Sequence, residues 1–159
     1  MAIREDSIVR TINKSFKNHI SSFYVIDKDG DLMYVFSSDS QNSEKINQDL
    51  LFKLITTMHS ISLETWEENL INVSLGKKIN FISTDNITGT FFILSCDVEA
   101  RFKHVVPILK KLKNSYLTYF TGIKFMNETT KFEANIAFQD SLDNILIEPI
   151  KTIKFLNAL

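Results

Sequence analysis

Cysteine is almost missing from this sequence, which contains only Cys96 among 159 residues. A disulfide framework and a cysteine-based zinc site are therefore both excluded. A chain of this length should bury about two-thirds of its extended surface, so it can fold without such cross-links. Cys96 ends the apolar segment TFFILSC, where a buried, inert thiol is expected. A nucleophilic pair formed by Cys96 and His104 stays open, because sequence alone does not eliminate it.

Glycine is also scarce, with four residues, and neither G-x-x-x-x-G-K-[ST] nor G-x-G-x-x-G occurs. A glycine-rich phosphate-binding loop is therefore excluded. The three histidines do not form H-x-x-x-H or H-E-x-x-H. His59 is expected near the end of a helix, where a cation would interact favourably with the helix dipole. No catalytic apparatus is visible, so we expect a protein that is not an enzyme and that has no cofactor or metal.

The sequence has no excess of positive charge and no long apolar run. Its formal net charge is -1, whereas dedicated nucleic-acid binders are usually strongly basic. No stretch approaches the roughly 18 consecutive apolar residues that would span a bilayer. The first residues, MAIREDSIVR, carry charges where a signal peptide needs an apolar core. We therefore expect a cytoplasmic protein that does not bind nucleic acid.

The segment YVIDKDGDLMYVF raises the question of a metal site, because three acidic residues lie between two apolar runs. Asp27, Asp29 and Asp31 match the first ligand positions of a helix-loop-helix calcium loop. Leu32 stands where that loop needs glycine, and Ser38 stands where it needs glutamate. The flanking residues are also typical of strands. The segment is therefore interpreted as a tight turn in a β-hairpin.

Hydrophobic periodicity predicts the order of the remaining elements. The expected helices are residues 3–18, residues 43–61 capped by Ser40 or Ser43, residues 99–120, and about 130–147, where Pro149 ends the helix before a short last one. The third of these either starts late, near His104, or bends at Pro107. The expected strands are residues 22–27, 31–37, 69–75, 78–84 and 90–96. Trp66 is expected to plug the edge of the core, beside a solvated acidic turn.

The predicted fold is α+β, with a five-stranded, mainly antiparallel sheet and the element order α-β-β-α-β-β-β-α-α. Strand 90–96 is nearly all apolar, which indicates a central strand covered on both faces. The hairpin 69–83 is expected at an edge of the sheet. We expect an N-terminal helix within residues 1–19, a core over 20–121 and a helical extension over 122–159.

The candidate contact residues are basic, and they suggest attraction to an acidic partner or to an anionic membrane surface. A solvated helix face is the simpler explanation for most of them. Two lie at the tip of the edge hairpin and the others lie in or near the helix 99–120: Lys77, Lys78, Arg101, Lys103, Lys110, Lys111 and Lys113.

The ββαβββα order, the hairpin FYVIDKDGDLMYVF and the segments INVSLGKKINFIS, TGTFFILSCD and SYLTYFTG resemble the longin and roadblock superfamily over roughly residues 20–120. The expected N-terminal helix resembles roadblock proteins, which begin with a helix. The expected helical tail resembles longins, which end with a further helix. The longin type is the favoured branch.

This resemblance implies a longin/roadblock-like sandwich that acts as a non-catalytic interaction scaffold. It implies dimerisation with another longin or roadblock domain, and association with a small GTPase or with vesicle-trafficking machinery. A roadblock-type homodimeric GTPase regulator is one alternative. Another is a PAS- or GAF-like small-molecule sensor, which would need a cavity with convergent polar groups; the strands offer Ser74, Asn80, Ser83 and Ser95 for one.

Overall fold

The computed structural model describes residues 20–37, 47–122 and 125–158, with residues 147–158 described by their backbone alone. The helix expected at 3–18 and the caps expected at Ser40 and Ser43 lie outside these ranges. The chain divides into one unit of residues 18–109 and a second unit that includes residues 110–159. Each unit is described by itself below.

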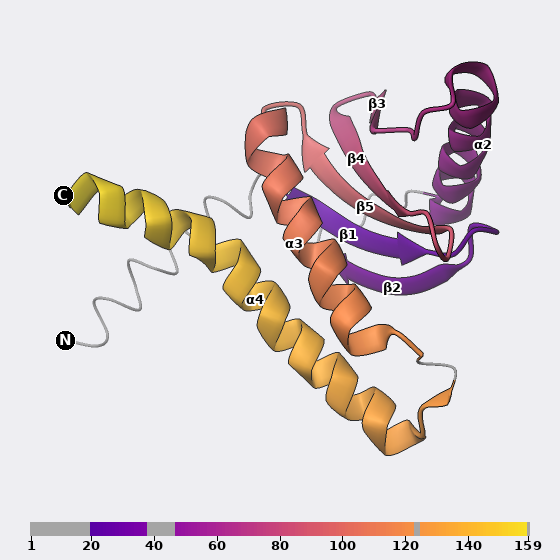
Figure 1. Ribbon diagram of the computed structural model, residues 1–159. Coiled ribbons are helices and arrows are strands. Elements are labelled where there is room, and N and C mark those ends of the chain that lie inside the picture. The colour runs from indigo at the N-terminus through magenta and orange to yellow at the C-terminus, as the bar shows by residue number, and fades with distance from the viewer. Residues whose placement is uncertain (1–19, 38–46, 123–124, 159) are drawn as a thin grey trace. The chain divides into compact units, whose positions relative to one another are not determined.

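The first unit contains a five-stranded sheet in the order β2-β1-β5-β4-β3 (Figure 1). All neighbouring strands are antiparallel. This confirms the predicted α+β class and the ββαβββα order, and it places the predicted hairpin 69–83 at an edge. The strands are β1 (Ile20–Ile26), β2 (Leu32–Ser37), β3 (Asn72–Leu75), β4 (Lys78–Asp85) and β5 (Thr90–Asp97).

The central strand is β5, as its apolar sequence predicts. It pairs with β1 on one side and with β4 on the other. Every residue from Thr90 to Cys96 is buried. Because successive side chains point to opposite faces, β5 contributes buried residues to both faces of the sheet.

Helix α2 (Gln48–Trp66) covers one face of the sheet. Leu51, Phe52 and Ile55 pack there in one cluster with side chains from all the strands except β2. The Asn47 side chain accepts a hydrogen bond from the Leu50 amide, so it caps the helix N-terminus.

The predicted end of this helix is wrong, because α2 extends to Trp66 rather than ending at residue 61. Glu67, in the left-handed conformation, ends the helix, and its backbone N–H donates a hydrogen bond to the Leu63 carbonyl. Trp66 is 69% exposed in the last turn, so it does not plug the core.

The other face of the sheet meets the start of helix α3 (Phe102–Phe120). The rings of Phe81 and Phe102 lie 6.0 Å apart, and Val105, Ile108 and Leu109 are buried. Helix α3 begins two residues before the predicted late start at His104, and it includes Pro107 in its second turn.

The second unit contains the end of α3 and helix α4 (Glu128–Ala158). Tyr116, Phe120 and Phe138 form an aromatic cluster with ring centroids 4.6–5.5 Å apart. The helical interpretation of the tail is confirmed. Pro149 does not end the helix as predicted, because α4 runs through it; a proline removes one backbone hydrogen bond and can kink a helix without terminating it.

The segment from Asp27 to Asp31 is a turn between β1 and β2, as predicted. One carboxylate oxygen of Asp27 accepts hydrogen bonds from the amides of Asp29 and Asp31, both at 2.9 Å. Gly30 adopts φ +86°, a conformation that other residues rarely take. Asp27 is therefore used as an acceptor for the turn itself. Among the described residues no cluster of three or more metal-ligating side chains occurs.

We expect Asp27→Ala to lower the free energy of unfolding by about 1–2 kcal/mol, because it removes the acceptor of two turn amides. Asp29→Ala is the matched control, since no hydrogen bond to its exposed carboxylate is recorded. Urea titration measures both variants. Calcium should leave the unfolding midpoint of the wild-type chain unchanged; a calcium-dependent rise that is lost in Asp27→Ala would contradict the turn interpretation.

Candidate functional site

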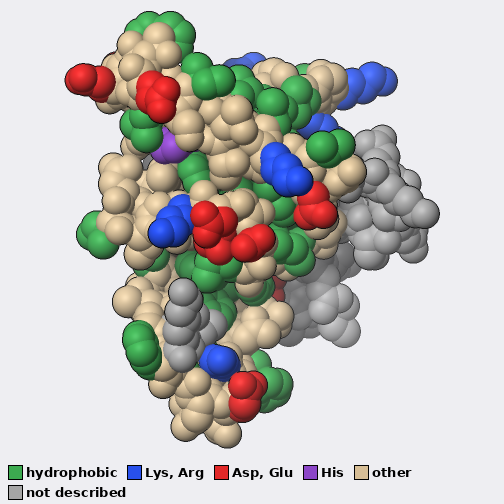
Figure 2. All heavy atoms as spheres, turned by 90° about the vertical axis from the view of Figure 1, so that its right-hand side faces the viewer, with side chains coloured by type: hydrophobic (Ala, Val, Ile, Leu, Met, Phe, Trp, Pro, Cys, Tyr) green, Lys and Arg blue, Asp and Glu red, His purple; other side chains and the backbone are tan. Residues whose placement is uncertain are grey.

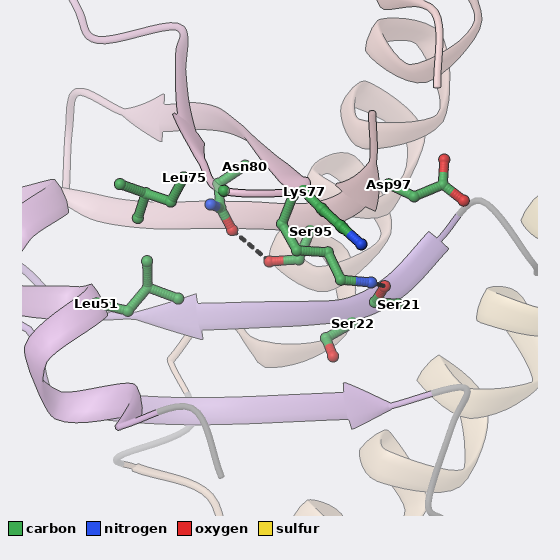
Figure 3. A pocket seen from close by; sticks show the side chains of 10 residues that line it. Ser21, Ser22, Leu51, Leu75, Lys77, Asn80, Ser95 and Asp97 are labelled. Carbon is green, nitrogen blue, oxygen red and sulfur yellow. Dashed lines mark hydrogen bonds between the residues drawn. The ribbon is translucent and has the colours of Figure 1, made fainter. Parts of the chain in front are cut away.

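A cavity of about 570 Å³ opens on the α2 face of the sheet, within the first unit (Figure 3). Its walls come from β1, from the end of β5, from the turn between β3 and β4, and from Leu51 of α2. The lining residues are Ser21, Ser22, Leu51, Leu75, Gly76, Lys77, Lys78, Asn80, Ser95 and Asp97. The volume lies within the usual range of small-molecule sites, roughly 300–1,000 Å³.

Three buried polar residues form a row across the floor of this cavity. Ser22 of β1 pairs with Ser95 of β5, which in turn pairs with Asn80 of β4. Each is at most 8% exposed. Elsewhere on this face the same three strands carry apolar residues, among them Tyr24, Ile93 and Ile82. The row therefore marks the place where the apolar core of this face stops.

The polar row is only partly satisfied by its own hydrogen bonds. The Ser95 hydroxyl donates to Asn80 Oδ1, and Asn80 Nδ2 donates to the Val73 carbonyl at 3.3 Å. The Val73 carbonyl can only accept, so it fixes the orientation of the amide. No hydrogen bond from the Ser22 hydroxyl is recorded within the described residues, although Ser22 is 8% exposed. The Ser22 hydroxyl lines the cavity and is accessible from it.

Lys78 brings a positive charge to one end of the cavity. Its amino group donates to Ser21 Oγ at 2.6 Å, across strands distant in the sequence. Ser21 lies at an irregularity of β1, where the pairing register with β5 shifts between Ile20 and Ser22. Lys78 itself is half-buried beside Asp97, its pairing partner on β5. The Lys78 ammonium group is therefore held against the wall of the cavity rather than extended into solvent.

Asp97 is the one carboxylate of the lining, and part of it is engaged outside the cavity. Its Oδ1 accepts a hydrogen bond from the Glu99 amide at 3.1 Å. Figure 3 shows its carboxylate pointing away from the Asn80, Ser95 and Ser22 side chains. Donor groups thus predominate on the inner surface of the cavity.

Cys96 has none of the features of a nucleophile. It is fully buried, and burial, together with the nearby Asp97 charge, raises the pKa of its thiol to about 12. Its Sγ contacts the Leu94 carbonyl, and His104 is exposed at the start of α3. The burial predicted for Cys96 is confirmed, and the structure records no Cys96–His104 pair among the described residues.

His59 is a core residue, so the prediction of a helix-end cation is wrong. It is 7% exposed, and its ring packs edge-on against Phe91 with centroids 4.9 Å apart. Nδ1 accepts a hydrogen bond from the Leu70 amide at 3.3 Å. Burial lowers the pKa of His59, which favours the neutral ring that this acceptor role requires.

The structure distributes the predicted basic contact residues over separate places. Lys77 is exposed at the β3–β4 turn, whereas Lys78 is half-buried in the cavity wall. Arg101 and Lys103 lie exposed at the start of α3, in the first unit. Lys110, Lys111 and Lys113 belong to the second unit.

Apolar side chains remain exposed on α2 and at the β3 edge, and the face that carries α2 shows apolar groups at many points (Figure 2). On α2, Leu50, Leu54 and Ile61 are 37–63% exposed. At the edge, Ile71 and Leu75 are 54% and 43% exposed and flank the buried Val73 at two-residue spacing.

The exposed residues Leu50, Leu54 and Ile61, called the α2 stripe below, lie on the β3 side of the helix. Thr56 lies beside the β1–β2 turn: a Cβ atom added to Gly30 would be 3.8 Å from Thr56 Cγ2. At 3.6 residues per turn, Leu50, Leu54 and Ile61 fall on the opposite flank of the helix. Leu51, beside that flank, lines the cavity together with Leu75 of β3. The stripe therefore faces away from the β1–β2 turn, and the cavity lies between Leu51 of α2 and Leu75 at the β3 edge.

Sequence reasoning identified part of the cavity and missed the rest. Asn80 and Ser95 were among the four polar strand residues considered, whereas Ser74 is exposed and Ser83 lies outside the lining. Ser22 was missed. Its signal was available, since Ser22, Tyr24 and Ile26 alternate on one face of β1 and only the first is polar.

No protein-family model matches this chain, and no curated protein matches it. Solved structures do. A Roadblock/LC7 domain from Streptomyces avermitilis has 20% identity and a TM-score of 0.45, and the match covers 63% of this chain and 87% of that one. MglB from Myxococcus xanthus has 8% identity and a TM-score of 0.42, with coverage of 91% and 95%. The gliding protein MglB from Thermus thermophilus has 9% identity and a TM-score of 0.45, with coverage of 88% and 89%.

All three matches are low in both identity and TM-score. The matched proteins carry roadblock and MglB names, and they give the favoured longin branch and its vesicle-trafficking role no support. Within the described residues, no helix is both long enough and apolar enough to cross a membrane.

The neutral state of His59 predicts a pH dependence of stability. Because burial lowers its pKa in the folded chain, the unfolded chain binds the proton more readily, and stability falls as pH drops below the unfolded value near 6.5. The slope for this one group is at most about 1.4 kcal/mol per pH unit.

Urea titrations between pH 7.5 and 5.5 measure this effect. His59→Asn keeps a hydrogen-bond acceptor near the Nδ1 position. We expect its free energy of unfolding to fall less steeply with decreasing pH than that of the wild type. His104→Asn changes an exposed histidine and should retain the wild-type slope. Equal slopes in the wild type and in His59→Asn would contradict the assignment.

Proposed function

We propose that this chain is a non-catalytic protein-interaction domain of the roadblock type, which self-associates and regulates or positions a small GTPase. The observation that carries the proposal is the exposure of apolar side chains at the β3 edge and on the α2 stripe. The resemblance of residues 20–120 to longin and roadblock sequences supports it as well, because the ββαβββα order on which it rests is present. The GTPase part follows from that resemblance and not from a site.

The β3 edge supplies the backbone part of the proposed contact. β3 is last in the sheet order and pairs only with β4 among the described strands. An edge strand presents unpaired amides and carbonyls, and natural proteins either cover or use them. Strand addition from a second copy would satisfy these groups. Lys77 remains exposed at the turn, where its charge limits uncontrolled pairing.

The α2 stripe supplies the side-chain part. Leu50, Leu54 and Ile61 together with Ile71 and Leu75 would leave water on self-association, at about 25 cal/mol per Å² of apolar surface. The same patch repeated on two copies suits a two-fold interface, in which one surface meets itself. β2 is the rival edge, since Leu32, Met33 and Val35 are also exposed on it.

We expect Ile61→Glu to weaken self-association at least tenfold, because it places a charge in the apolar stripe; a tenfold change corresponds to about 1.4 kcal/mol. Light scattering and sedimentation over a range of concentrations measure the dissociation constant. Leu63→Glu changes an exposed leucine of the same helix on the other flank, and Val35→Glu changes the β2 edge.

Both control variants should associate like the wild type. If Val35→Glu alone produces monomers, the interface is at β2. A wild-type chain that stays monomeric at high micromolar concentration would refute self-association.

The small GTPase is tested separately. Immobilised chain should retain a small GTPase from an extract of its own cells in one nucleotide state more than in the other, and mass spectrometry would identify it. The Ile61→Glu variant shows whether retention requires self-association. Absence of retention in both nucleotide states would refute the GTPase part while leaving the self-association result intact.

A further inference from the structure

We propose that the cavity on the α2 face is a binding site for a small amphiphilic carboxylate, whose acid group lies at Lys78 and Ser22 and whose apolar chain lies against Leu51 and Leu75. This site goes beyond the proposed interaction function and does not depend on it. All of its residues belong to the first unit.

The polar row is the first argument for a ligand. A sheet face that packs against a helix is normally apolar, and the rest of this face is. Burying polar groups costs free energy unless they find partners. Ser95 and Asn80 satisfy each other in part, whereas the Ser22 hydroxyl has no recorded hydrogen bond among the described residues and is accessible from the cavity. Its hydroxyl lines the cavity, so a bound molecule can supply the missing partner.

The balance of donors and acceptors is the second argument, and it sets the chemistry of the ligand. Lys78 Nζ has three donors and uses one on Ser21 Oγ. Asn80 Nδ2 has two donors, and the recorded bond to Val73 uses one. The Ser22 hydroxyl adds a further donor. The carboxylate of Asp97 points away and accepts from the Glu99 amide. A surplus of donors near the Lys78 ammonium group favours an acceptor, and most simply an anion.

The apolar walls are the third argument. Leu51 is buried in the α2 core contact, whereas Leu75 is 43% exposed at the rim. In Figure 3 both leucines lie at the same end of the cavity, away from the Asp97 carboxylate. A ligand with a charged head and an aliphatic chain matches a donor-rich end and an apolar end. The volume of about 570 Å³ accommodates a short fatty acid and does not require a macromolecule.

Octanoate, octylamine and octanol test the site, because they share a chain and differ only in the head group. Each is titrated into the full isotope-labelled chain, below its micelle-forming concentration, while the backbone amides are followed by NMR. We expect saturable shifts with octanoate at Ser22, Asn80 and Ser95, weaker shifts with octanol, and none there with octylamine.

Three variants assign the chemistry. Lys78→Met should weaken octanoate binding at least tenfold and leave octanol binding unchanged. Ser22→Ala, which removes only the hydroxyl oxygen, should weaken octanoate binding several-fold while keeping the fold, which protects the test if Lys78→Met is unstable. Lys53→Met changes an exposed lysine of α2 and should bind like the wild type.

The proposal is overturned by any of three results. Octanoate and octanol could bind equally and be insensitive to Lys78→Met and Ser22→Ala. The shifts could map to the α2 stripe around Leu50 and Ile61, which would indicate adsorption to the apolar surface. Finally, octanoate could cause no saturable shift at the cavity residues.

Discussion

Burial of β5 on both faces is the constraint on which the rest of this structure depends. Phe92 and Leu94 point to one face and Phe91 and Ile93 to the other, and all four are at most 4% exposed. Such a strand needs a partner strand on each side and a cover on each face, because neither its backbone nor its side chains can face water. β1 and β4 supply the partners, α2 covers one face, and the start of α3 contacts the other. The outer strands β2 and β3 lie at the edges of the sheet, and both carry exposed apolar residues.

The cavity exists because α2 does not cover its face completely. Asn47 caps the helix, and Leu51 is the first residue that it buries in the core. Ser22, Ser95 and Asn80 lie at the corresponding end of the sheet, and Leu51 borders the space above them. Apolar residues at these positions would expose apolar surface to the water in the cavity, which is unfavourable. Polar residues tolerate water in the space and can exchange it for a polar ligand, at the cost of a less complete core.

Much of the first unit could be predicted from its sequence, because its strands and α2 have clear periodicity. The alternation in INVSLGKKINFIS predicted an edge hairpin, and the unbroken TFFILSC predicted a central strand. The predictions for Trp66, His59 and Pro149 were wrong for a common reason, since each depends on the spatial neighbours of the residue. Trp66 is exposed, His59 contacts Phe91 and Leu70, and the backbone of α4 continues past Pro149. The sequence did not identify Ser22 as a cavity residue, because that role depends on its neighbours across the sheet. These neighbours are Ser95 and, beyond it, Asn80, and both are distant from Ser22 in the chain.

The β3–β4 turn connects the two proposed binding surfaces. Leu75 contributes an exposed side chain to the β3 edge and also lines the cavity, while Lys78 begins β4 and holds Ser21 of β1. A ligand that engages Lys78 would compete with its hydrogen bond to Ser21. Binding free energies at two linked sites are reciprocal, so a ligand that favours pairing at β3 must itself bind the paired form more tightly. Leu75 ends β3 and Lys78 begins β4, so the two proposed surfaces share the hairpin that these strands form.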